Sequence, residues 1–432
     1  MRFWRALLLP MLTLFCIAAK AAPEPMDALA ESYVRLVLRV AAHEPAYLDA
    51  YFGPESWKAD AERTAGTPQS LIADADRLTT SLKALPQGKG IEVQRRAFLL
   101  AQLGAVRTKL AQMAGAKPLP YADEALAFYG ISPPAGTLAD LDPALARIDA
   151  LLPGEGPLAD RVAAFRKLYE VKPDRLDAVA RTAVAECRRR TQAAIGLPAG
   201  EDFRLEIVHD KPWAAYNWYQ GKGHSLMQFN TRYPLALDRV LETACHEAYP
   251  GHHLHNSLLD AELVQKRGWV EFSIYPLSTP FFLIAEGIGN VAPELAFTEA
   301  DRIAFERDTL NPLAGLGATA DPTRYRQVAR ELQALKAAGP LVAADYLDGR
   351  IDRETAVERI SRYALLDRQQ AEASVDLMPK FRSYGLNYTL GEQLVRTYVE
   401  AAGPDRTARW AALRHLLTEP VTPAELLAVA NH

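Results

Sequence analysis

Apolar residues recur every three or four positions over most of this chain, which is the spacing that places them on one face of an α-helix. The pattern is clear over residues 26–45, 91–115, 158–171 and 174–196, and clusters of glycine and proline separate these segments. No segment repeats at a fixed period, so a solenoid is not expected. The pattern therefore predicts a mainly α-helical globular fold.

A different pattern occupies the middle of the chain. Residues 203–210, 213–221 and 225–231 are rich in aromatic and β-branched side chains, and Lys-Pro and Gly-Lys-Gly connections separate them. Such segments are typical of short strands. We expect one small antiparallel β-sheet next to the helix that follows, with its last strand offering an edge to an extended peptide.

The first residues form a separate unit. Two arginines precede an apolar run over residues 6–19, and small residues follow it. This order predicts a secretory signal peptide over residues 1–22, which is removed from the mature protein. The apolar run is too short to span a membrane comfortably, and Phe15 argues against lipoprotein anchoring through Cys16. We therefore expect an exported, periplasmic protein whose mature chain has no transmembrane segment.

The mature chain is expected to hold an N-terminal helical region over residues 23–196 and a catalytic region over residues 197–432, which can share one core. Loss of the three basic residues of the leader takes the formal net charge from −4 to −7, and an acidic chain offers no basic surface for nucleic acid. Cys187 and Cys245 remain. Two cysteines so far apart do not make a disulfide scaffold, and we expect Cys245 to be a buried packing residue.

Candidate chemistry concentrates in residues 244–256, ACHEAYPGHHLHN, which contain four histidines and one glutamate. In the zinc-protease motif H-E-x-x-H, two histidines four residues apart share a helix face and bind one zinc ion. The glutamate beside the first histidine reaches the water that the zinc activates. Here the motif begins at His246 and Glu247, so Glu247 is the predicted catalytic base, but Pro250 stands at the place of the second histidine.

The second histidine ligand is therefore His252 or His253. On an ideal helix, His253 returns to within about 20° of the face that carries His246. Pro250, however, cannot donate an N–H group to the carbonyl of His246, and Gly251 adds backbone freedom. A bulge at these two residues would absorb two extra positions and return His252 to the metal face. The residues alone leave both histidines possible.

A catalytic zinc ion needs a third protein ligand, and Glu286 is the candidate. It lies in an apolar helix expected over residues 279–297, where a carboxylate is costly unless it is paired or bound to a metal. Asn290 follows one turn later and suits a residue that holds a ligand imidazole. These residues predict a site for one Zn²⁺ ion. His224, near the sheet, is a candidate for substrate contact.

The segment HEAYPGHHLH resembles the H-E-x-x-P-G-H-H-L signature of the bacterial domain of unknown function 885 family, which is similar to the gluzincin zinc metallopeptidases. Its G-H-x-L-H ending is similar to that of oligopeptidase-type gluzincins, and this resemblance favours His252 as the second ligand. The family usually continues with E-G-W-A-L-Y-A-E at the third ligand. This chain has EGIGNVAPE and keeps only Glu286 and Gly287 of that pattern. The resemblance therefore supports the metal ligand more strongly than the residues of the substrate pocket.

A second segment, FRSYGLNYTLG at residues 381–391, is similar to the family's R-Y-I-x-x-P-G-Q-A-L-x-Y-x-x-G but lacks its proline and glutamine. The match nominates Arg382 for substrate binding, and Tyr384 and Tyr388 as hydroxyl donors to a tetrahedral intermediate. Packing of the two rings on a helix is the alternative. Over residues 200–400, the resemblance implies a zincin-like helical metallopeptidase fold, one zinc ion and hydrolysis of peptides.

Together these features predict an exported zinc-dependent metallohydrolase that acts on a peptide or another small amide. Two alternatives stay open. One is a zinc hydrolase of a non-peptide amide or ester that uses the same residues. The other is a non-catalytic periplasmic binding protein, in which His252 and His253 would both close a metal site made of four protein ligands.

Overall fold

The computed structural model describes residues 25–86, 88–211, 213–232, 234–317 and 319–430. The predicted signal peptide and Cys16 lie outside these ranges. Within them the fold is mainly α-helical, as the spacing of apolar residues predicts. The helices of the first half are α1 (Pro25–His43), α2 (Glu55–Arg63), α3 (Pro68–Ala84), α4 (Ile91–Met113), α5 (Tyr121–Tyr129), α6 (Asp142–Leu151), α7 (Leu158–Lys167) and α8 (Pro173–Ile195).

The second half continues as helices after a short β region. The α-helices are α9 (Leu237–Glu247), α10 (His252–Leu259), α11 (Pro280–Ala296), α12 (Glu299–Phe305), α13 (Asn311–Ala314), α14 (Pro322–Ala334), α15 (Ala338–Leu347), α16 (Arg353–Tyr363), α17 (Arg368–Phe381), α18 (Leu390–Ala401), α19 (Arg406–Thr418) and α20 (Pro423–Ala430). Short 3₁₀ or π turns connect some of them, namely η1 (Pro45–Tyr47), η2 (Leu138–Leu141), η3 (Asp260–Gln265), η4 (Val270–Ser273), η5 (Glu306–Leu310), η6 (Leu335–Ala337) and η7 (Arg382–Tyr388).

The three predicted strands form a sheet, but its pairing differs from the prediction. Strands β2 (Asp202–Val208), β3 (Ala215–Gly221) and β4 (His224–Asn230) lie in the order β2-β4-β3. The β4 strand is antiparallel to β3 and parallel to β2. The sheet is therefore mixed, and β4 is its central strand rather than an edge. Residue alternation along a strand is the same in both kinds of pairing, so it does not reveal direction.

A second sheet, which the sequence did not suggest, joins distant parts of the chain. Strand β1 (Leu48–Tyr51) pairs antiparallel with β5 (Ile274–Pro276). Beside it, the buried Arg95 of α4 donates to Glu271 of η4, with Nε and Oε1 2.5 Å apart. The apolar core around α1 and α4 also includes Leu259 and Phe272. The two regions predicted to meet at residue 196 thus share a core.

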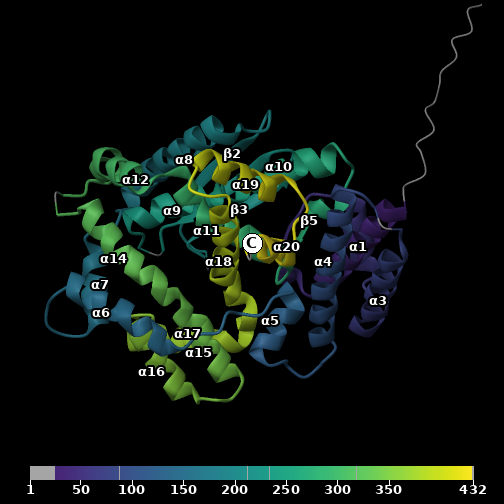
Figure 1. Cartoon of the computed structure of the whole chain (residues 1–432), viewed down its shortest axis with the longest axis horizontal. Coiled ribbons are helices and arrows are strands. Elements are labelled where there is room, and N and C mark those ends of the chain that lie inside the picture. The colour runs from purple at the N-terminus through teal and green to yellow at the C-terminus, as the bar shows by residue number, and fades with distance from the viewer. Residues whose placement is uncertain (1–24, 87, 212, 233, 318, 431–432) are drawn as a thin grey trace, which may run out of the picture.

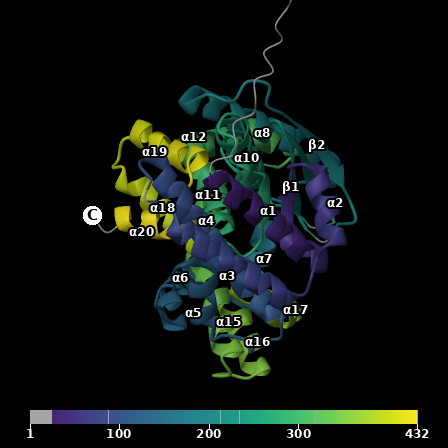
Figure 2. The same cartoon turned by 90° about the vertical axis from the view of Figure 1, so that its right-hand side faces the viewer.

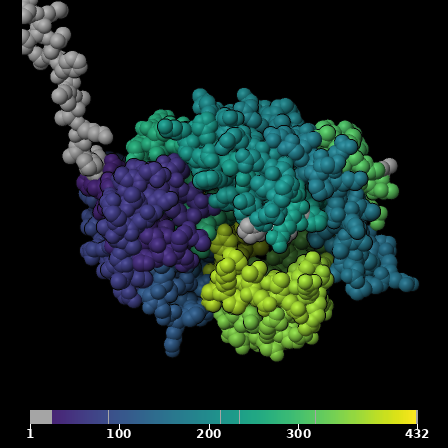
Figure 3. Space-filling view, turned by 180° about the vertical axis from the view of Figure 1, so that it is seen from behind, coloured from purple at the N-terminus to yellow at the C-terminus, as the bar shows by residue number. Residues whose placement is uncertain are grey.

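The helices α9, α11 and α18 occupy the middle of the molecule, with α1, α3 and α4 on one side and α6, α7 and α14 on the other (Figure 1). Turned by 90°, the view shows α3 and α4 in front and α15 and α16 below them (Figure 2). The space-filling view from behind shows a hollow between the teal upper part of the molecule and the yellow-green lower part (Figure 3). Within the described ranges, none of the helices has the length and apolar character needed to cross a membrane.

Candidate metal centre

The break between α9 and α10 shapes the histidine segment. The N–H of Gly251 donates to the carbonyl of Cys245 at 3.1 Å, and that of Leu254 donates to Ala248 at 3.2 Å. Both bonds span six residues instead of the four of an α-helix. The turn therefore absorbs two extra residues, and it does so by dividing the helix into α9 and α10 rather than by a bulge in one helix.

This turn requires glycine at position 251 because the chain passes directly over the end of α9. A Cβ atom at Gly251 would overlap the carbonyl group of His246 and lie 2.6 Å from the carbonyl oxygen of Cys245. The close passage places His252 at the first position of α10 and turns its ring toward His246, with ring centroids 4.6 Å apart.

Three side chains converge at this point from α9, α10 and α11. Nε2 of His246 lies 3.5 Å from Oε2 of Glu286, and Nε2 of His252 lies 3.7 Å from Oε1 of the same carboxylate. One ligand atom from each of the three residues lies within 4.8 Å of the others. Ligands at 2.0–2.2 Å from a tetrahedral zinc ion are roughly 3.3–3.6 Å apart. The spacing of these donors therefore fits a single zinc ion.

The electrostatics of the three donors also fit a cation. Burial lowers the pKa of both His246 and His252 to about 4, so both imidazoles are neutral at pH 7, as metal binding requires. Burial raises the pKa of Glu286. Its Oε2 atom is buried and has no hydrogen-bond partner among the described residues. An unpartnered carboxylate oxygen beside two neutral imidazoles is a group that a metal ion would satisfy.

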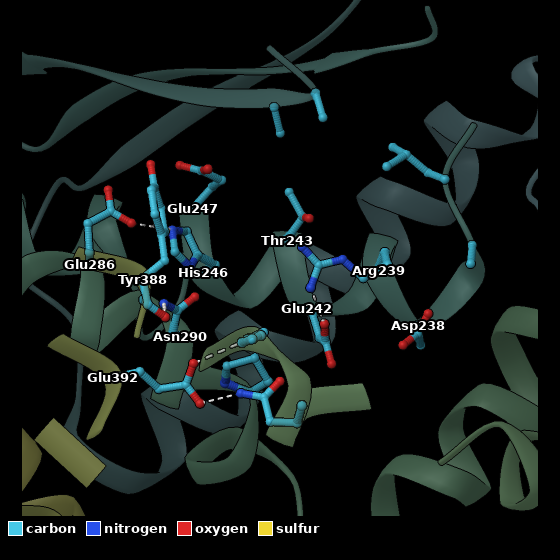
Figure 4. A pocket seen from close by; sticks show the side chains of 18 of the residues that line it. Asp238, Arg239, Glu242, Thr243, His246, Glu247, Glu286, Asn290, Tyr388 and Glu392 are labelled. Atoms are coloured by element: carbon cyan, nitrogen blue, oxygen red, sulfur yellow. Dashed lines mark hydrogen bonds and ion pairs between the residues drawn. The ribbon is translucent and has the colours of Figure 1, made fainter. Parts of the chain in front are cut away.

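The His246 ring is held from the side of α11. The ring packs on Gly289, where a Cβ atom would lie 2.7 Å from its Nδ1. Asn290 lies next to the ring (Figure 4) and donates to the carbonyl of Tyr388 at 3.4 Å. Asn290 therefore lies where the sequence predicted a residue that orients a ligand imidazole.

Glu247 faces the same cleft, which has a volume of about 1090 Å³ and room for a peptide segment. Glu247, Glu286 and Tyr388 surround His246 at one end of the cleft, and Arg239 and Glu242 lie farther along it (Figure 4). Burial, with the nearby charges of Glu286 and Asp49, raises the pKa of Glu247 well above its ordinary value. A carboxyl group with a raised pKa is suited to proton transfer near neutral pH.

The two predicted tyrosines line the cleft from η7. The rings of Tyr384 and Tyr388 meet edge to face with centroids 6.1 Å apart. Burial raises the pKa of both, so both hydroxyls keep their protons as hydrogen-bond donors.

His253, the other predicted candidate for second ligand, points away from the cleft into a buried polar network. Its Nε2 lies 2.9 Å from Glu201, and its Nδ1 lies 2.8 Å from the hydroxyl of Ser225. Burial opposes ionisation of Glu201, but hydrogen bonds from His253, Tyr249 and Arg188 outweigh it and lower its pKa to about 2. Both ring nitrogens of His253 are occupied, and the network fixes the first turn of α10 to the sheet.

Two predicted substrate contacts are not brought to the cleft. The guanidinium of Arg382 pairs with the buried Glu124 of α5 and donates to the carbonyl of Leu119 at 2.8 Å, which ties η7 to the N-terminal helices. His224 lies at the exposed start of β4, away from the residues that line the cleft.

Several residues of the site could not be found from the sequence. Asp49 of β1, with Trp213 and Tyr216 from the sheet region, lines the cleft beside Glu247. Glu201, which anchors His253, looks in the sequence like an ordinary loop residue. No motif surrounds any of them, because elements distant in sequence bring them to the site.

The sequence predicted Cys245 as a buried packing residue, and Cys245 is fully buried, but its pairing with Cys187 was not predicted. The two cysteines form a buried disulfide that joins α8 to α9, with Cα atoms 5.6 Å apart and a sequence separation of 58. The helices cross where both cysteines face the core, and sequence distance carries no information on such a contact. The bond immediately precedes His246, so it also fixes the end of α9 that carries the site.

No family model matches this chain, and no curated protein matches it. Solved structures with a similar fold include a lipoprotein candidate from Colwellia psychrerythraea, at 15% identity and a TM-score of 0.49, covering 85% of this chain and 67% of that one. A lipoprotein candidate of unknown function from Shewanella oneidensis has 11% identity, a TM-score of 0.48, and coverage of 94% and 76%.

A third similar structure is metallocarboxypeptidase 1 of Trypanosoma cruzi, at 13% identity and a TM-score of 0.47, covering 94% of each chain. At these sequence identities and TM-scores, the similarity supports no conclusion about the activity or ligand of this chain.

Proposed function

We propose that this protein is a zinc-dependent hydrolase that cleaves peptide bonds, and that it belongs with the domain of unknown function 885 proteins its motif resembles. The observation that carries the proposal is the convergence of His246, His252 and Glu286 at one end of a large cleft, with Glu247 facing the same space. Two neutral imidazoles, one carboxylate and an adjacent glutamate are the set that a catalytic zinc hydrolase needs.

The residues present divide the work as follows. When bound by His246, His252 and Glu286, zinc supplies Lewis-acid chemistry by lowering the pKa of a water molecule and polarising a carbonyl group. Glu247 accepts a proton from the attacking water and delivers it to the leaving amine. The Tyr388 hydroxyl, oriented by Tyr384, donates a hydrogen bond to the oxyanion of the tetrahedral intermediate.

The position of His253 argues against the non-catalytic alternative. A purely structural zinc site is closed by four protein ligands, and His253 was the candidate for the fourth. Both of its ring nitrogens are already bound to Glu201 and Ser225. Three protein donors leave one position for a water molecule, which favours catalysis.

Export is part of the same proposal. Disulfides persist in oxidising compartments such as the periplasm, and the pairing of Cys187 with Cys245 supports the predicted secretory signal. A periplasmic enzyme would meet peptides that enter through the outer membrane or come from the cell envelope.

Substitution of Glu247 by Gln tests the mechanism. The variant should keep its zinc content, because Glu247 is not a ligand, and lose hydrolysis by about 10²–10⁴-fold, because the proton acceptor is gone. Zinc is measured by elemental analysis and turnover with matched peptide, amide and ester libraries. Glu262, which is partly exposed and pairs with Lys266 outside the cleft, provides the Glu262→Gln control. Undiminished turnover in Glu247→Gln would refute the role of Glu247, and ester-only turnover would favour the non-peptide alternative.

A further inference from the structure

Asp49 places a third carboxylate at the metal end of the cleft. It comes from β1, more than 190 residues before His246, and lines the cleft with Glu247 and Glu286. The hydroxyl of Tyr216 donates to its Oδ1 at 3.0 Å and lies 3.2 Å from its backbone oxygen. Tyr216 therefore fixes the Asp49 side chain in place, and the second carboxylate oxygen of Asp49 has no hydrogen-bond partner among the described residues.

The charge at this end of the cleft is unbalanced. Asp49, Glu247 and Glu286 carry three negative charges when ionised, and one divalent metal ion compensates only two. No lysine or arginine forms an ion pair with Asp49 in the described part of the chain. Burial raises the pKa of Asp49 to about 7, against the hydrogen bond from Tyr216, and Glu286 adds to the rise. A carboxylate in this state is stabilised when a cation arrives.

Six of the basic residues that line the cleft pair with acidic residues other than Asp49, namely Arg239, Arg302, Arg326, Arg330, Lys336 and Arg396. Arg239 pairs with Glu242 at 2.6 Å, and Lys336 pairs with Glu392 at 3.3 Å. Arg239 lies farther along the cleft from Glu247 and Glu286, beyond Thr243 (Figure 4). The cleft therefore has one end with paired charges and one end with an excess of negative charge.

Two aromatic residues continue the wall that carries Asp49, because Tyr216 contacts Asp49 and Trp213 lies against Tyr216. The rings of Trp213 and Tyr216 have centroids 5.7 Å apart, and both residues line the cleft. The face of an aromatic ring attracts organic cations, most strongly when water is excluded. A carboxylate bonded to a tyrosine whose ring lies against a tryptophan is a combination that recognises ammonium or guanidinium groups rather than neutral ones.

We propose that Asp49, Tyr216 and Trp213 form a subsite for a positively charged nitrogen of the substrate, so that the enzyme selects peptides with a cationic group near the scissile bond. The inference rests on the proposed peptidase function and adds its substrate class. The cation is either the free α-ammonium group of a peptide or the side chain of a lysine or arginine residue. Asp49 acts here as a binding residue and takes no part in proton transfer.

A matched peptide series tests the subsite and distinguishes the two sources of charge. Peptides with a free or an acetylated N-terminus report the α-ammonium group, and peptides with lysine or norleucine report the side chain. In one of these pairs, kcat/KM of the zinc-loaded wild type should be at least about tenfold higher for the cationic member. In Asp49→Asn that ratio should fall to within about twofold. Asp202→Asn, an exposed change on β2 outside the cleft, should keep the wild-type ratio.

Binding gives a readout that does not depend on turnover. The zinc-loaded Glu247→Gln variant and its Asp49→Asn derivative are titrated with the same peptides in a calorimeter. The cationic peptide should bind at least about tenfold more tightly than its neutral partner only when Asp49 is present. Equal affinities in both pairs would overturn the subsite even if the wild type hydrolyses peptides. Absence of hydrolysis together with preferential binding through Asp49 would refute the peptidase and keep the cation subsite.

Discussion

Replacement of Gly251 by Ala is the most direct test of how the chain builds the metal centre. Gly251 lies between the two histidine donors, five residues after His246 and immediately before His252. An added methyl group would overlap the carbonyl group of His246 and lie 2.6 Å from the carbonyl oxygen of Cys245. Both are backbone atoms at the end of a buried helix, so neither can rotate away as a flexible side chain can.

The size of the effect follows from these contacts. Non-bonded carbon and oxygen atoms pack at about 3.5 Å, so relief of the Cys245 contact alone needs a movement of about 0.9 Å. Metal–ligand distances tolerate changes of only about 0.2 Å. We expect zinc affinity to fall at least about 100-fold, at or beyond the top of the range seen for loss of a supporting residue. The free energy of unfolding of the metal-free protein should fall by about 1–3 kcal/mol from overpacking.

Zinc affinity is measured by competition with a chelator of known affinity, and stability by urea denaturation of the metal-free protein. Gly104→Ala is the matched control, because Gly104 is exposed within α4 and a Cβ atom there would meet no other atom within 4 Å. It should raise stability by about 0.5–1 kcal/mol through helix propensity and leave zinc affinity unchanged. Wild-type zinc affinity in Gly251→Ala would show that the turn does not position the ligands.

Two further predictions concern the surroundings of the site. Replacement of both Cys187 and Cys245 by Ala should lower the free energy of unfolding by about 4 kcal/mol, as expected for opening a loop of 58 residues; a loss below about 1 kcal/mol in urea denaturation would contradict the bond. Because the pKa of Glu201 is about 2 in the folded protein, below the ordinary value of about 4.3, its ionised form stabilises the fold fully above pH 4.3. The stability difference between wild type and Glu201→Gln should therefore shrink as the pH falls from 4.3 to 2, and a pH-independent difference would contradict the network.

The sequence predicted long periodic elements well and short ones poorly. Helices α1, α4 and α8 lie where their apolar spacing placed them, because each buries one continuous face. Strands β1 and β5 have four and three residues, too few for any periodicity to appear. Because neither strand was predicted, Asp49 was not recognised as a site residue. The pairing of β1 with β5 brings that carboxylate to the cleft.

The residues of the site that lie close together in sequence were predicted. Residues 246–252 carry a recognisable pattern, and the helix break at Pro250 and Gly251 indicated that ideal helical spacing would not apply. Arg382 shows the opposite case. Its partner Glu124 lies 258 residues earlier, so the sequence could not show that the guanidinium is already used. Contacts of this kind depend on tertiary packing, which no local pattern records.

The metal centre depends on glycines at close backbone contacts as much as on its ligands. Gly251 lets the chain pass over the end of α9. The His246 ring rests on Gly289, and the backbones of Gly287 and Gly391 approach so closely that a Cβ atom at Gly287 would lie 2.6 Å from the carbonyl carbon of Gly391. That last contact holds α18, and with it η7 and its tyrosines, against the helix that carries Glu286. An alanine at position 289 would force the ring or α11 to move by several tenths of an ångström. The donors on three separate helices thus meet only because these four positions carry no side chain.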